Sequence, residues 1–127
     1  MTLRDLFDDD MEYEFEMKTF DEYEEEAMNT AVYDGEVIYP TLGLVSEAGE
    51  VADKIKKLMR DEDIDLGFEM SEEQRRAVAL EVSDCLWYVT ALASDLGYSL
   101  EDIANMNIEK LRDRKDRNAI HGSGDER

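Results

Sequence analysis

The fold of this chain is decided by the stretch Leu42-Gly-Leu-Val-Ser-Glu-Ala-Gly-Glu-Val-Ala-Asp-Lys-Ile-Lys-Lys57. Its apolar residues recur three and four positions apart, which is the period of an amphipathic α-helix. Glu47 and Glu50 lie at the edge of the apolar face. A carboxylate in such a place is costly to bury unless a cation lies close to it. The stretch therefore predicts an amphipathic helix with an acidic pair on the shoulder of its apolar face.

A second segment, Leu80-Glu-Val-Ser-Asp-Cys-Leu-Trp-Tyr-Val89, repeats this arrangement. Glu81 and Asp84 fall at the same angles to their apolar arc as Glu47 and Glu50 when each residue advances by about 100°. Packing the two helices together would bring the four carboxylates to one place. Hard oxygen ligands with no histidine or thiolate nearby suit Mg²⁺, and also Mn²⁺. The predicted metal ligands are Glu47, Glu50, Glu81 and Asp84.

Composition limits what this site and this chain can do. Acidic residues number 34 in 127, so one acidic pair alone favours a solvated helix face, and only the matched placement of both pairs favours a metal site. The net charge of −20 argues against binding to nucleic acid or to anionic membranes. No apolar run long enough to span a bilayer and no signal peptide is recognised in the sequence. The single cysteine, Cys85, is expected to be a packed, reduced thiol, which fits a cytoplasmic protein.

Helix start and stop signals divide the chain into four expected helices. We predict one all-α domain over residues 19–127, preceded by an acidic arm over residues 1–18. Residues 61–67 form a polar loop, and the short link after Gly97 predicts that the last two helices form a tight hairpin. The expected helices run from the capping box Thr19–Glu22 to before Asp34-Gly35, from Pro40 to about Arg60, from the capping box Ser71–Gln74 to about Leu96, and from Ser99 onward.

Five further polar residues are candidates for binding a substrate. Asn107 interrupts the apolar stripe of the fourth helix, and Lys110 and Arg114 follow on one shoulder. Asn107 could bond a neighbouring backbone group, or all three could face the cavity of the acids and hold phosphate or sugar. Lys54 and Lys57 could pair with acids along their own helix or bind phosphate. The residues leave both choices open.

With these motifs the chain resembles the all-α nucleoside triphosphate pyrophosphohydrolases, specifically short single-domain MazG-like proteins, over roughly residues 19–127. The resemblance implies a four-helix bundle that assembles as a homodimer or homotetramer and uses Mg²⁺ held by the two acidic pairs. It implies hydrolysis of a nucleoside triphosphate between its α and β phosphates. Lys54, Asn107 and Lys110 match positions that the family uses around the nucleotide. Departures are a long gap between the acidic pairs, Glu24 where relatives commonly have glutamine, and Asn118 where they often have glycine.

The predicted mechanism uses a water activated by the metal, with Glu50 as the catalytic base that also ligates the metal. His121, the only histidine, lies in a glycine-rich tail and is not expected to be that base. The tail, Gly122–Asp125, could wrap phosphate or be a flexible end. Two alternatives stay open: a dUTP- or dCTP-directed pyrophosphatase of the same superfamily, and a non-enzymatic acidic helical protein that binds a basic partner or mimics nucleic acid.

Overall fold

The computed structural model describes residues 16, 19–62 and 69–117, and over these residues the chain is all-helical with no strand. The all-α class predicted from the sequence is confirmed for this part of the chain. Most of the predicted acidic arm, most of the polar loop and the tail from Asn118, with His121, lie outside the described residues. The four helices are α1 (Phe20–Met28), α2 (Ile38–Asp61), α3 (Glu72–Asp95) and α4 (Leu100–Asp116).

Side-chain caps define where three of these helices begin. The two predicted capping boxes, Thr19 with Glu22 and Ser71 with Gln74, are both present, and Ser99 forms a third with Asp102. In each, the cap side chain accepts a hydrogen bond from an N–H that the helix itself leaves unpaired. α2 has no such side-chain cap and begins at Ile38, two residues before the predicted start.

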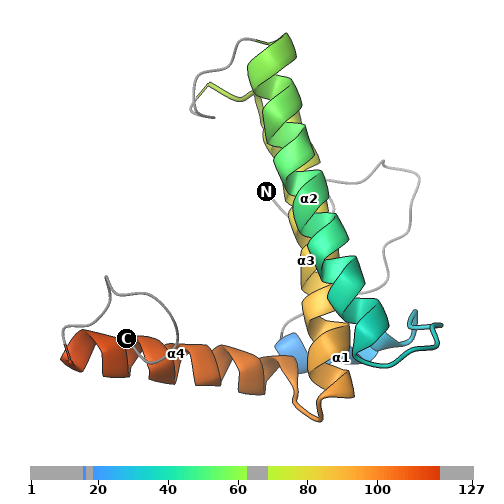
Figure 1. Ribbon diagram of the computed structural model, residues 1–127, viewed down its shortest axis with the longest axis vertical. Coiled ribbons are helices and arrows are strands. Elements are labelled where there is room, and N and C mark those ends of the chain that lie inside the picture. Colours follow the sequence, from blue (N-terminus) through green and yellow to red (C-terminus); the bar gives the residue numbers. More distant parts are fainter. Residues whose placement is uncertain (1–15, 17–18, 63–68, 118–127) are drawn as a thin grey trace.

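α2 and α3 run antiparallel side by side and form the longest contact of the molecule (Figure 1). One side of the predicted apolar face of α2 packs against α3, with Leu44, Ile55 and Leu58 half-buried. The other side of the same face is open, since Val45 is 68% exposed and Met59 is 50% exposed. The hairpin therefore leaves one side of this apolar face exposed.

The small core of the described residues lies at the end of the hairpin, where α1, α3 and α4 contact one another. Ala91 and Ala93 of α3 are buried there, together with Ala27 of α1 and Leu100 of α4. Gly97 has a φ of 85°, which lets the chain leave α3 by a sharp turn, as the sequence predicted.

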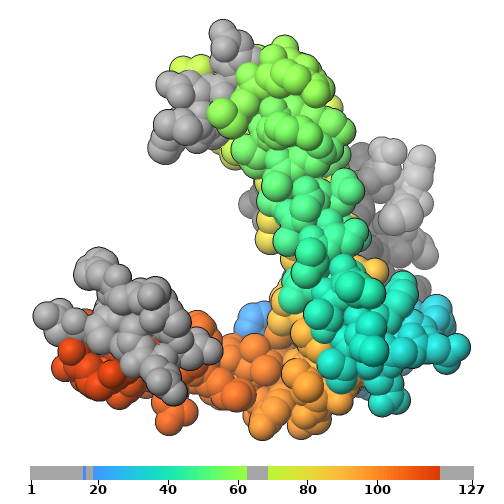
Figure 2. Space-filling view, in the orientation of Figure 1, coloured from blue at the N-terminus to red at the C-terminus, as the bar shows by residue number. Residues whose placement is uncertain are grey.

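The direction of α4 corrects two expectations. α4 projects away from the α2–α3 hairpin and gives the molecule an angular outline (Figures 1 and 2). No Cα of α4 lies within 8 Å of one in α2, and its contacts with α3 are confined to the neighbourhood of their connection. The predicted α3–α4 hairpin is therefore wrong, and the four described helices of one chain do not close into a bundle. The chain turns sharply at Gly97, and the first turn of α4 is held by α1 as well as by α3.

α3 also departs from what the sequence indicated about membranes. Among the described residues it is one helix that is long and apolar enough to cross a bilayer by length and composition. Glu81 and Asp84 lie in the middle of it, where a bilayer disfavours charge. A core helix of a soluble protein has the same length and composition, so this finding assigns nothing by itself.

Candidate metal centre

Three of the four predicted acids meet between the two helices of the hairpin. Glu47 of α2 and Glu81 and Asp84 of α3 each offer a carboxylate oxygen within 4.8 Å of the others. Glu47 and Glu81 are half-buried and Asp84 is exposed. The i,i+3 spacing within α3 and the antiparallel packing of α2 and α3 are what bring these side chains together.

The electrostatics of this acidic cluster favour a cation. Burial, and then the charges of Asp84, Glu81 and Glu50, raise the pKa of Glu47 above its ordinary value. Two ligands of one Mg²⁺ lie at most about 4.2 Å apart, given bond lengths of about 2.1 Å, so oxygens within 4.8 Å need only small side-chain rotations. The donor set, all carboxylate oxygens, suits a hard divalent ion. The residues present therefore fit a magnesium or manganese ion.

Glu50, the predicted catalytic base, lies outside the group of three. It is exposed on α2, one turn after Glu47. Its charge nevertheless contributes to the raised pKa of Glu47 and to that of Lys57. Glu50 thus lies at the rim of the cluster, with a carboxylate open to solvent.

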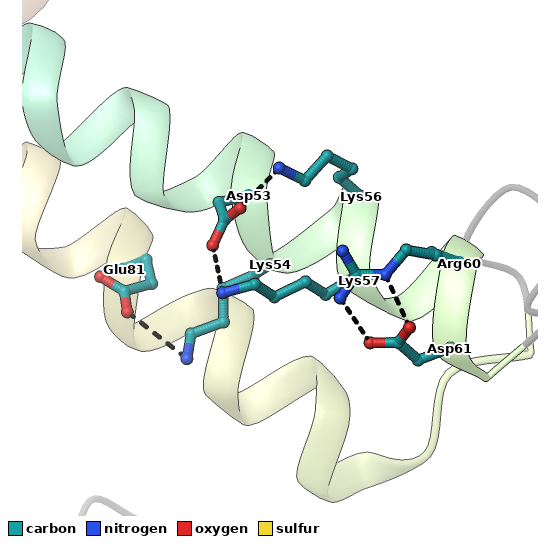
Figure 3. Close-up of polar contacts among 7 residues, drawn as sticks. All are labelled: Asp53, Lys54, Lys56, Lys57, Arg60, Asp61 and Glu81. Carbon is teal, nitrogen blue, oxygen red and sulfur yellow. Dashed lines mark hydrogen bonds and ion pairs between the residues drawn. The ribbon is translucent and has the colours of Figure 1, made fainter.

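Lys54, Lys56 and Lys57 of α2 form three ion pairs, one with Glu81 of α3 and two with Asp53 of α2 (Figure 3). Lys54 Nζ lies 3.7 Å from Oε1 of Glu81 and so connects α2 to the acidic cluster of α3. Lys57 Nζ lies 2.6 Å from Asp53, which also pairs with Lys56 at 2.9 Å. These two lysines lower the pKa of Asp53 to about 2. Of the two readings left open by the sequence, pairing along the helix describes Lys57, whereas Lys54 reaches across to a predicted metal ligand.

A cavity of about 280 Å³ opens beside the acids and is lined by Glu47, Asp84, Trp87 and Tyr88. The sequence reasoning used Trp87 and Tyr88 only as context for the motif and missed this position. Their spacing could have revealed it, because they follow Asp84 by three and four residues and so share its helix face. Tyr88 lies directly over Gly43 of α2, where a Cβ atom would clash with its ring.

Trp87 also fixes the end of α1 beneath this cavity. Its indole N–H donates to the carbonyl oxygen of Ala27 at 3.2 Å and to the hydroxyl of Thr30 at 3.0 Å. Tyr23 of α1 hydrogen-bonds to the buried Thr90 of α3, and burial, together with the charge of Asp84, raises the pKa of Tyr23. α1 therefore packs against α3 near Trp87 and Thr90.

The candidates on α4 are not brought to the acids within one chain. Asn107 and Lys110 are exposed, so Asn107 is not the buried amide that the apolar pattern suggested. Arg114 is buried, with 7% of its surface exposed. Because α4 projects away from the hairpin (Figure 1), these three residues lie apart from the acidic cluster of the same chain.

Glu24 has a structural role that the sequence did not indicate. Its Oε1 accepts a hydrogen bond from the backbone N–H of Leu100 at 3.2 Å. A carboxylate at this place pairs a free N–H of the first turn of α4 and complements the positive end of the helix dipole. The residue that departs from the family pattern therefore connects α1 to α4 in this chain.

Fold and site together define an all-α protein with a carboxylate cluster suited to a divalent cation. Residues 40–118 match the MazG nucleotide pyrophosphohydrolase domain. The chain is also similar to the Gene 37 protein of Mycobacterium phage L5, with 42% identity over 115 residues that cover 84% of this chain and 97% of the phage protein. No solved structure matches the chain significantly. The chain belongs to the MazG nucleotide pyrophosphohydrolase family.

Proposed function

We propose that this protein is a nucleoside triphosphate pyrophosphohydrolase that depends on a divalent metal ion. It cleaves a ribo- or deoxyribonucleoside triphosphate between the α and β phosphates and releases the monophosphate and pyrophosphate. The observation that carries the proposal is the meeting of Glu47, Glu81 and Asp84 within 4.8 Å in a chain of the MazG family.

In this proposal the three clustered acids hold the cation, with Mg²⁺ preferred over Mn²⁺. A bound ion supplies neutralisation of the phosphate charge and lowers the pKa of a water molecule. Glu50, exposed at the rim, accepts the proton that the attacking water loses and completes the set of ligands. Lys54 lies next to the cluster through its pair with Glu81 and can exchange that carboxylate for a phosphate oxygen.

The cavity beside the acids is small for a ligand site. Its volume is about 280 Å³, and ligand sites commonly have roughly 300–1,000 Å³. We infer that it receives one part of the nucleotide, and that the rest is bound at a surface that one chain does not complete.

Assembly into a homodimer or homotetramer is the second part of the proposal. Leu42 and Val45, on the open side of α2, are 66% and 68% exposed, and Ile108 and Leu111 of α4 are 46% and 42% exposed. Apolar surface of this extent is typical of an interface between subunits. In such an assembly the exposed Asn107 and Lys110 reach the acids of a neighbouring subunit instead of those of their own, whereas Arg114 is buried within its own chain.

The test is release of pyrophosphate from a panel of ribo- and deoxyribonucleoside triphosphates with Mg²⁺ or Mn²⁺. EDTA should abolish release, and Glu81→Gln and Glu50→Gln should lower kcat by about 100-fold or more. Glu26→Gln, a change of the same chemistry at an exposed site on α1, is the matched control and should leave the rate unchanged.

Dependence on metal together with loss of activity in both site variants would establish the class, and the ranking of bases would separate a general enzyme from a dUTP- or dCTP-directed one. Absence of release from every nucleotide, by protein with intact far-UV circular dichroism, would contradict the proposal. It would favour the acidic binding protein instead.

A further inference from the structure

The segment between α1 and α2 contains a strained turn at Val37. Its φ of 64° and ψ of −50° are those of a γ-turn, and the N–H of Ile38 donates to the carbonyl oxygen of Glu36 at 2.7 Å. A γ-turn of positive φ is rare, and a β-branched residue seldom adopts it. Strain of this kind persists only where surrounding contacts hold the backbone in place. The turn therefore requires a contact from outside the segment.

Asp95, the last residue of α3, supplies that contact. Its Oδ2 accepts a hydrogen bond from the N–H of Val37 at 2.9 Å and another from the hydroxyl of Tyr33 at 2.9 Å. Burial, and then the hydrogen bond to Asp95, raise the pKa of Tyr33 to about 12, so the phenol is protonated and donates at neutral pH. One carboxylate thus ties both ends of residues 33–37 to α3.

The hydrogen bonds that Asp95 accepts from Tyr33 and Val37 form a clamp. A series of ring contacts leads from Tyr33 in this clamp to the candidate active site. Tyr33 stacks on Tyr39, with ring centroids 4.9 Å apart and planes inclined by 16°. Tyr39 in turn lies 6.3 Å from Tyr88 and hydrogen-bonds to it, which raises the pKa of Tyr88. Tyr88 forms part of the wall of the cavity beside the acids. Each ring therefore limits where the next can lie.

We propose that Asp95 is a positioning residue for the candidate active site. It fixes the turn at Val37 and the stack of Tyr33 on Tyr39, and through them it fixes Tyr88 at the wall of the cavity. The inference rests on the proposed function, since the ligand of that cavity is taken to be the nucleotide. Asp95 itself stands apart from the cluster and acts through other residues.

The experiment compares Asp95→Ala, Asp95→Asn and Tyr33→Phe with Asp116→Asn, a control at an exposed site at the end of α4. For each variant we would record the near-UV circular dichroism, the ultraviolet titration of tyrosine, the affinity for Mn²⁺ alone and the steady-state kinetics. The near-UV and titration measurements need no turnover.

Asp95→Ala should weaken the near-UV tyrosine signal and raise KM by about tenfold, with kcat changed by less than about twofold. Tyr33 should titrate at lower pH in this variant. Mn²⁺ affinity should stay unchanged, because the acids are carried by the α2–α3 hairpin. Asp95→Asn should lie between the wild type and Asp95→Ala, because the amide oxygen still accepts hydrogen bonds but carries no charge.

Three results would overturn the inference. One is an unchanged near-UV spectrum and tyrosine titration in Asp95→Ala. Another is an unchanged KM, and the third is a fall in Mn²⁺ affinity as large as the rise in KM, which would mean that Asp95 only stabilises the hairpin. If Asp95→Ala fails to fold, the same measurements on Asp95→Asn and Tyr33→Phe are compared with the wild type instead. A wild type without turnover would contradict the proposed function, whereas the spectroscopic measurements alone decide whether the clamp exists.

Discussion

At the scale of single residues, the charge that the proposed function requires of Glu47 opposes folding. The pKa of Glu47 is raised above the ordinary value of 4.5, so the protonated carboxyl group favours the folded state at low pH, and this contribution is lost as pH rises through the raised value. At pH 7 the charged group therefore opposes folding in the absence of metal. Neighbouring carboxylates that repel one another in this way are expected at a site that binds a cation.

Glu47→Gln should accordingly raise the melting temperature at pH 7 in EDTA and should remove the further rise that Mg²⁺ produces in the wild type. A ligand at 100 times its Kd stabilises a protein by about 2.7 kcal/mol, which thermal unfolding can detect. Glu26→Gln serves as the control, and it should change neither temperature. A metal-induced rise that survives in Glu47→Gln would remove Glu47 from the set of ligands.

Two glycines of α2 give a second prediction at this scale. A methyl group at Gly43 would clash with the ring of Tyr88, whereas one at Gly49 would meet nothing within 4 Å. Alanine is favoured over glycine inside a helix by about 1 kcal/mol, and crowding a packed site costs about 1–3 kcal/mol. Urea unfolding should therefore show that Gly49→Ala stabilises the protein and that Gly43→Ala does not. Equal gains in both would mean that Tyr88 does not lie against α2.

At the scale of elements, the first turn of α4 depends on α1. Removing the hydrogen bond from Leu100 N–H to the carboxylate of Glu24 with Glu24→Ala should destabilise the fold by about 0.5–1 kcal/mol. The exposed neighbour Glu25 is the control, since Glu25→Ala should have almost no effect. Chemical denaturation measures both changes. A larger loss in Glu25→Ala than in Glu24→Ala would contradict the connection between the two helices.

At the scale of the whole molecule, the open face of α2 determines the predicted assembly. Val45→Lys places a charge where the proposed interface excludes water and should weaken self-association by about tenfold or more, as seen by analytical ultracentrifugation. Val32→Lys, at a site that is 92% exposed in the link before α2, should leave association unchanged. If the wild type is monomeric at every concentration, the proposal that a second subunit completes the site is wrong.

Pyrophosphatase activity should follow the same dependence on assembly. If Lys110 of one subunit reaches the acids of another, a mixture of inactive Glu81→Gln and inactive Lys110→Ala subunits should regain part of the activity. Such complementation arises because some mixed assemblies contain one intact site. Mixtures that stay as inactive as their components would contradict the placement of Lys110 at the acids of a neighbouring subunit.

Local features of the sequence by themselves determined the helices and the spacing of the acids. Helix caps such as Thr19 and Ser71 act over three or four residues, and so does the apolar period. Neither depends on residues that are distant in the sequence. The same period placed Glu47, Glu81 and Asp84 at matching positions on two helices, so their meeting could be predicted once the two helices were paired.

Only the tertiary structure decided the rest, because it depends on contacts between residues far apart in the chain. Glu24 accepts a hydrogen bond from Leu100, and Asp95 accepts hydrogen bonds from Tyr33 and Val37. No local sequence pattern predicts these contacts. The short link at Gly97 is compatible with a hairpin, yet α4 projects away from α2 and α3, and its first turn contacts α1. The lengths and faces of the helices are thus local properties of the sequence, whereas their directions and the walls of the site are decided by packing.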